Sequence, residues 1–189
     1  MSRPFQTINI IYSTKSLNLV DFYTLEPLYK VKVDRHVPQI ESRRVQAGPD
    51  SYNDEALLDD HRPWKDNVCT ATFKLTSLNV CLSIHEHTDI EFKRDHILSS
   101  QYTFSSPFLN STTLMWKADG VFSGNFLLTD DTKGTVLARF RNRLFSNTEV
   151  GTLEIVDEIA PDLKDEVVIS GLAMLVMLQS LNLSVMIMV

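Results

Sequence analysis

The C-terminal segment from Val167 to Val189 carries no charged residue, and it constrains the fold more than any other part of the chain. Between Val167 and Leu178 only Ser170 and Gly171 are not apolar. On a helix these side chains would cover every face, so the helix must be buried on all sides, in protein or in lipid. Each Leu, Met or Val left in water would forgo about 1.5–3 kcal/mol of burial. The rest of the chain must therefore enclose this helix, or the helix must lie in a membrane.

The length and the flanks of this segment favour a helix in the protein core. A membrane-spanning helix needs about 20 mainly apolar residues, but the strictly apolar run ends at Leu178. Asp162, Asp165 and Glu166 precede it, and such acids suit the positive end of the dipole in the first turn of a helix. No basic residue follows to mark a membrane anchor. We expect a core helix; the alternatives are a tail anchor over residues 167–189 and a helix packed between subunits.

Composition and charge bound the class of protein. At 189 residues the chain is expected to form a single domain over 1–189, with a flexible loop at 47–67, where Gly, Pro and acidic residues cluster. The net charge of −6 argues against nucleic acid as a partner. Cys69 and Cys81 do not suggest a disulfide framework, and the chain begins without a signal peptide's apolar stretch. A cytoplasmic location is therefore predicted.

The segments before the apolar run alternate like short, half-buried strands. Tyr29, Val31 and Val33 are separated by charged residues, which is the period of a strand with one buried face. Residues 68–84 continue this pattern, with a change of parity at 76–77 that indicates a bulge or a turn. Residues 112–156 form a series of expected hairpins with turns at short intervals. A closed barrel threaded by the helix satisfies both the strands and the apolar segment, and closure removes exposed strand edges.

Several stretches resemble the Tubby C-terminal-like domain superfamily, and its fungal members in particular. They are KGTVLARF at Lys133–Phe140, VGTLEI at Val150–Ile155, DEVVISGLAML at Asp165–Leu175, and PLYKV at Pro27–Val31. The superfamily also includes the LURP-one-related plant proteins and the phospholipid scramblases. The resemblance implies a mainly β fold, a closed antiparallel barrel of about twelve strands around a central hydrophobic C-terminal helix. Leu181–Val189 extends beyond the usual end of that helix.

Basic residues are concentrated on one candidate strand. Arg139, Arg141 and Arg143 share a parity, Lys133 lies in the turn before them, and Lys117 lies one hairpin earlier. A guanidinium group matches phosphate through two parallel hydrogen bonds, and the resemblance implies phosphoinositide binding, as in Tubby domains. We expect a non-enzymatic barrel, peripheral at membranes, that binds anionic phospholipid or a protein partner through this face. The alternative is a solvated face whose arginines pair with Glu149, Glu154 or Asp130.

Signals for chemistry are weak. His85 and His87 would share a face if both lay on a strand, as a metal pair requires, but no third ligand has convincing spacing and a polar hairpin end explains them better. Cys69 and Cys81 suit small structural positions. The chain carries no phosphate-binding or dinucleotide-binding motif, so no cofactor is expected. An enzyme or a small-ligand carrier stays an alternative that requires a cavity inside the barrel. The sequence leaves the oligomeric state open.

Overall fold

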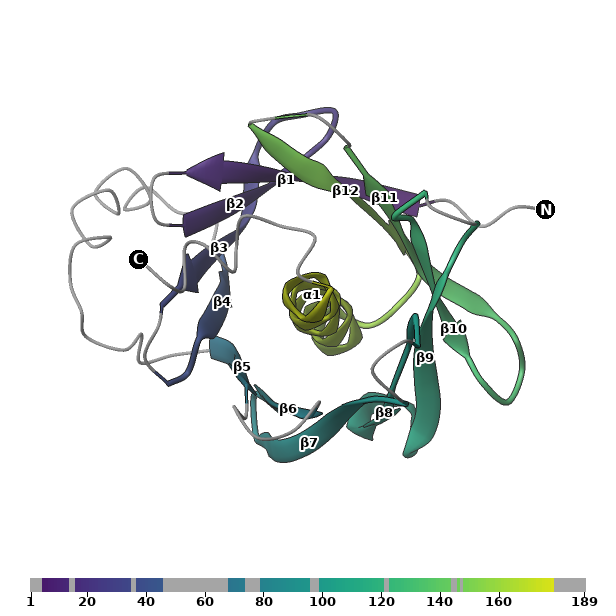
Figure 1. Cartoon of the computed structure of the whole chain (residues 1–189). Helices are drawn as coiled ribbons and strands as arrows, with labels where there is room; N and C mark the ends of the chain where they lie inside the picture. Colours follow the sequence, from purple (N-terminus) through teal and green to yellow (C-terminus); the bar gives the residue numbers. More distant parts are fainter. Residues whose placement is uncertain are drawn as a thin grey trace.

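The described part of the chain forms a closed antiparallel barrel around one helix (Figure 1). A computed structural model describes residues 5–13, 16–34, 37–45, 68–73, 79–95, 99–120, 123–143, 146 and 148–178. Twelve strands are found in these ranges, and each pairs with its neighbours in sequence until β12 closes the ring against β1. Their bounds are β1 (Phe5–Ser13), β2 (Ser16–Asp21), β3 (Pro27–Val33), β4 (Ile40–Arg44), β5 (Val68–Phe73), β6 (Asn79–Ile84), β7 (His87–Arg94), β8 (Gln101–Ser106), β9 (Thr112–Ala118), β10 (Phe126–Asp130), β11 (Val136–Asn142) and β12 (Glu149–Val156).

Helix α1 (Pro161–Met177) lies inside the ring of strands, which confirms the expected fold class. Every residue from Asp165 to Leu175 is buried, so the helix is covered on all faces by the barrel. No helix in the described ranges is long and apolar enough to cross a membrane. The segment expected as a loop at 47–67, and residues 179–189 at the end of the tail-anchor alternative, lie outside the described residues.

The apolar side chains that alternate along the strands face the helix. Tyr29, Val31 and Val33 of β3 are buried, and Val80, Leu82 and Ile84 of β6 are buried in the same way. Strands β5 and β6 pair antiparallel from Cys69 with Ile84 to Phe73 with Val80. The bulge or turn expected at 76–77 lies outside the described residues. Alternation thus builds the inner surface that covers α1.

Polar and small residues set how α1 packs against the wall. The indole Nε1 of Trp116, a fully buried side chain of β9, donates a hydrogen bond to Ser170 Oγ at 3.1 Å. A Cβ on Gly171 would lie 3.4 Å from the Trp116 ring, so glycine lets the helix come close to this indole. On another side the helix comes close to β4, β5 and β6. The helix therefore has a defined rotation although its apolar pattern prefers no face.

The acidic residues before the apolar run do not all lie where the sequence suggested. The helix begins at Pro161, a favoured residue for the first helical position, and Asp162 lies in the first turn as expected. Asp165 and Glu166 lie one turn further in and are buried. The expectation that they lie in the first turn is wrong, because the helix begins at Pro161, and the barrel wall covers both side chains.

Candidate functional site

The three arginines lie on the outer surface of β11 and its end, but two of them are paired. Ala138 and Phe140 are buried, which directs the alternate residues outward. Arg141 Nε lies 2.8 Å from Glu154 Oε1, and Arg143 Nε lies 3.4 Å from Glu149 Oε2. Both acids belong to the adjacent strand β12. Such exposed pairs contribute little stability, but they neutralise much of the positive charge that these arginines were expected to present to phosphate.

Lys117 and Arg139 form the part of this face that keeps its charge. Lys117 pairs in register with Leu127, and Leu127 pairs with Arg139, so the two cations lie in one row about 10 Å apart across two strand spacings. The Arg139 guanidinium lies 5.0 Å from the Phe5 ring centroid, a cation–π contact. Within the described ranges neither cation forms an ion pair. Lys133 is exposed in the turn after β10, at the opposite end of β11 from Arg143, and is separate from this row.

A second group of functional side chains lies where the start of α1 meets the barrel wall. Cys69 on β5, His85 in the turn between β6 and β7, and Asp165 on α1 each place one donor atom within 4.8 Å of the other two. His85 Nε2 lies 2.9 Å from Asp165 Oδ2 and 3.6 Å from Asp162 Oδ1. We call Cys69, His85, Asp162 and Asp165 the mouth cluster. Three separate elements contribute to it, which fixes this end of the helix to one side of the barrel.

The second carboxylate oxygen of Asp165 is held by two further donors from the wall. Tyr29 Oη donates to Asp165 Oδ1 at 2.8 Å, and Arg44 Nη2 donates to the same oxygen at 2.7 Å. Arg44 Nη2 also donates to the main-chain oxygen of Pro161 at 2.7 Å. Burial and the charge of Asp165 raise the pKa of Tyr29 well above its usual value, so the phenol remains a donor. The charge of the buried Asp165 carboxylate is therefore compensated on the side of β3 and β4.

Cys69 is buried, and its thiol holds its proton strongly. Burial first, and then the negative charge of Asp165, raise the pKa of Cys69 to about 12. At neutral pH a thiol in this state is a poor nucleophile, because the thiolate is the reactive form. The arrangement of cysteine, histidine and aspartate therefore suits metal ligation better than nucleophilic catalysis, since a bound cation itself displaces the thiol proton.

The turn at His85 separates the two histidines that the sequence suggested as a pair. Ile84 pairs with His87, so His85 and Glu86 form a two-residue hairpin turn, and His85 has a φ of +53°. His85 belongs to the mouth cluster, whereas His87 is the first residue of β7 and is exposed. Each ring packs edge-on against Phe108 of the 3-10 helix η2 (Pro107–Leu109), with ring centroids 6.4 Å and 5.0 Å apart. The two histidines therefore do not share a strand face, and the expectation of a polar hairpin end is confirmed.

The sequence analysis missed the residues that surround His85 because they are distant from it in the chain. Cys69 is on β5, one strand before the β6–β7 hairpin, and Asp162 and Asp165 follow after β12. The spacing of the two acids was the one local signal: residues three apart on a helix lie on the same face. No pattern in the sequence indicated that this face meets His85.

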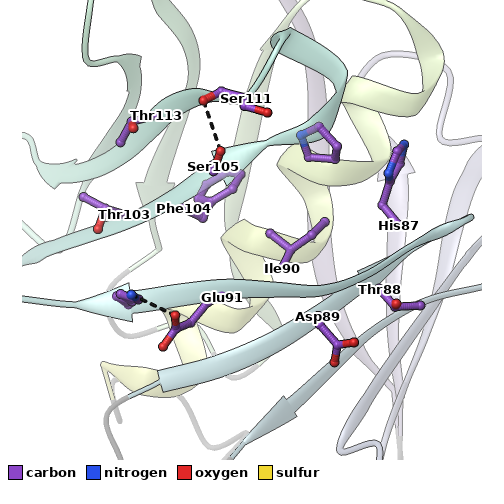
Figure 2. A pocket seen from close by; sticks show the side chains of 12 residues that line it. His87, Thr88, Asp89, Ile90, Glu91, Thr103, Phe104, Ser105, Ser111 and Thr113 are labelled. Carbon is purple, nitrogen blue, oxygen red and sulfur yellow. Dashed lines mark hydrogen bonds and ion pairs between the residues drawn. The ribbon is translucent and has the colours of Figure 1, made fainter.

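A pocket opens in the barrel wall between β7 and β8 (Figure 2). The two strands pair only at Lys93 with Thr103 and Arg94 with Tyr102, and they leave a cavity of about 460 Å³ beyond these pairs. Hydroxyl groups line it, with Ser105 Oγ donating to the main-chain oxygen of Ser111 at 3.1 Å. The pocket also holds Asp89 and Glu91. Lys93 also lines the pocket, and its Nζ lies 2.8 Å from Glu91 Oε2, so both signs of charge are present. The pocket lies in the wall rather than inside the barrel.

Comparison with known proteins does not assign the chain to a family. The resemblance to the Tubby C-terminal-like superfamily thus stays a prediction from the sequence. No family model matches the chain, and neither a curated protein nor a solved structure matches it.

Proposed function

We propose that this chain is a non-enzymatic binding domain that recognises anionic phospholipid head groups through Lys117 and Arg139. The observation that carries the proposal is the row Lys117–Leu127–Arg139 on the outer face, in which two cations flank an apolar side chain. Cations at this spacing match two phosphates, either on one head group or on neighbouring lipids. Leu127 between them suits the boundary between head groups and acyl chains.

The architecture supports recognition at the surface. Helix α1 occupies the interior of the barrel, and its residues from Asp165 to Leu175 are buried, which favours a binding role for the outer face. The barrel with its central helix also agrees with the sequence resemblance to the Tubby C-terminal-like superfamily, whose Tubby domains bind phosphoinositides. We infer a cytoplasmic protein that is peripheral at membranes.

The charge distribution predicts how such binding behaves. The chain has a net charge of −6, and Arg141 and Arg143 are paired with acids, so attraction to a membrane is local to the row. Each lysine or arginine near an anionic bilayer contributes about 1 kcal/mol. Binding should therefore be weak at physiological ionic strength, where the Debye length is about 8 Å, and stronger at low salt.

Vesicle sedimentation tests the proposal. Wild-type protein should bind phosphatidylcholine vesicles that contain a phosphoinositide, should not bind vesicles of phosphatidylcholine alone, and should lose affinity as salt rises. Lys117→Ala with Arg139→Ala should weaken binding by about 30-fold, since two contacts of about 1 kcal/mol are removed. The matched control, Lys32→Ala with Lys133→Ala, removes the same formal charge from lysines on β3 and in the turn after β10, away from the row, and should change affinity little. No binding to the anionic vesicles, or equal losses in both double variants, would overturn the proposal.

A further inference from the structure

We propose that the mouth cluster is a zinc site, in which Cys69, His85 and Asp165 bind one Zn²⁺ ion and Asp162 completes the coordination. The donor atoms of the first three residues all lie within 4.8 Å of one another. They come from β5, from the β6–β7 turn and from α1, so the fold itself brings them together. This site is separate from the basic row on the outer face of β9 to β11.

The donor set selects the class of metal. A thiolate, an imidazole and carboxylates together are the ligands that zinc takes in proteins, whereas magnesium and calcium prefer oxygen alone. Asp162 supplies the fourth donor, because its Oδ1 lies 3.6 Å from His85 Nε2 on the exposed side of the cluster. A site with four protein donors is typical of a structural zinc ion.

Among Cys69, His85 and Asp165 the distances require only small movements. Zinc lies about 2.3 Å from sulfur and about 2.0–2.2 Å from nitrogen or oxygen, so donors at tetrahedral angles are about 3.3–3.7 Å apart. The 2.9 Å contact between His85 and Asp165 has to widen, and longer separations have to shorten, by on the order of 1 Å. The residues that must move are at the edge: His85 lies in a hairpin turn, and the Asp162 side chain is 61% exposed.

The surroundings orient Asp165 as a metal ligand. Tyr29 and Arg44 both donate to Oδ1, which leaves Oδ2 directed at His85. Metal-binding carboxylates are commonly held in this way by a second layer of donors. A Cys69 thiolate, two aspartates and the Arg44 guanidinium carry a net charge of −2, which one Zn²⁺ balances. The Cys69 proton leaves to solvent as the sulfur–metal bond forms.

Cobalt substitution tests the sulfur ligand directly. Full-length protein stripped with a chelator and titrated with Co²⁺ should bind one ion per chain. It should show thiolate-to-cobalt absorption in the near ultraviolet and the visible bands of a four-coordinate site. Cys69→Ser should lose the thiolate band, while Cys81→Ser, the matched control at the other cysteine, should keep it. A folded wild-type protein without stoichiometric binding, or a band lost in Cys81→Ser, would overturn the proposal and leave the cluster as an ion-pair network only.

Two further variants keep the test decisive if Cys69→Ser does not fold. Asp162→Asn changes an exposed side chain and should weaken zinc affinity by about 10-fold or more. His85→Asn, which tolerates the left-handed backbone, should abolish tight binding, whereas His87→Asn should not. Zinc at about 100 times its dissociation constant should raise the melting temperature of the wild type by about 5–10 °C. Zinc affinity that is the same in the wild type, Asp162→Asn and His85→Asn would overturn the assignment.

Discussion

The Nε2 atom of His85 lies 2.9 Å from Oδ2 of Asp165, although 80 positions separate the two residues in the chain. This contact joins the β6–β7 hairpin to the second turn of an otherwise apolar helix. Tyr29 and Arg44 hold the other oxygen of the same carboxylate from β3 and β4. One buried aspartate therefore connects the helix to three separate parts of the barrel wall, and this connection fixes the position of the helix start.

Removal of the Asp165 charge should destabilise the fold. Asp165→Asn leaves Arg44 without its buried counter-ion and weakens the hydrogen bonds of Tyr29 and His85. Fully buried pairs lose about 3–5 kcal/mol in this way. Since the Arg44 side chain is 40% exposed and water can solvate it, we expect a loss of about 2–3 kcal/mol. Urea unfolding in the presence of a chelator measures the change.

Asp162→Asn is the matched control for this experiment, because the same substitution is made on the same helix beside the same histidine. Its side chain is largely exposed, so its unfolding free energy should change by less than about 0.5 kcal/mol. Equal losses in the two variants would show that the buried network around Asp165 has no special role in stability.

Glu166 should make the barrel less stable as pH rises. Its side chain is fully buried, Ser106 Oγ donates to Oε2 at 2.5 Å, and Oε1 has no partner within the described residues. Burial raises the pKa of Glu166 from 4.5 to about 7. The folded state therefore holds a proton that the unfolded state releases above pH 4.5, so stability falls between about pH 4.5 and pH 7 and then levels off.

Glu166→Gln removes this titration, and urea unfolding at pH 5 and pH 8 with a chelator present tests the sign. Between pH 5 and pH 8 the free energy of unfolding of the variant should rise by about 2–3 kcal/mol relative to that of the wild type, because each pKa unit corresponds to 1.36 kcal/mol. At pH 5 the two proteins should differ little, because the folded wild type carries a protonated glutamate. A constant difference across this range would contradict the prediction.

Gly151 on β12 should tolerate no side chain. A Cβ at this position would overlap the main-chain oxygen of Arg141 and would lie 2.8 Å from the Phe140 ring. Since backbone cannot move aside without breaking the β11–β12 ladder, Gly151→Ala should cost more than about 2 kcal/mol or prevent folding. Thermal unfolding followed by circular dichroism measures the effect.

Gly134→Ala separates this steric effect from backbone strain. Gly134 has a φ of +65°, but a Cβ there would meet nothing within 4 Å. The substitution should therefore destabilise the fold by about 1–2 kcal/mol, the cost of placing alanine in the left-handed backbone conformation. If Gly151→Ala were no more harmful than Gly134→Ala, the close approach of β11 and β12 would not be what requires glycine.

The basic row and the mouth cluster differ in how far the sequence predicts them. The outward direction of Arg139, Arg141 and Arg143 follows from strand alternation, which is a local property. The sequence also indicates Glu149 and Glu154 as acids that could pair with these arginines, and the structure confirms both. Only the register of β12 against β11 decides that Glu154 pairs with Arg141 and Glu149 with Arg143. Sequence reasoning named His85 as a metal candidate but gave it His87 as a partner, since neighbours in the chain were the only visible ones.

Residue pattern alone is enough to predict a closed β-barrel with its C-terminal helix inside. A helix that is apolar on every face must be enclosed, and the alternating strands supply the enclosing surface. The side chains that meet at the helix start, in contrast, become visible only in the folded barrel. An evenly apolar helix has no preferred rotation of its own. The contacts of Asp165 with His85 and of Ser170 with Trp116 therefore depend on how the helix packs inside the assembled barrel. Burial is specified by composition and period, whereas a polar contact between distant positions is specified by strand register and helix rotation together.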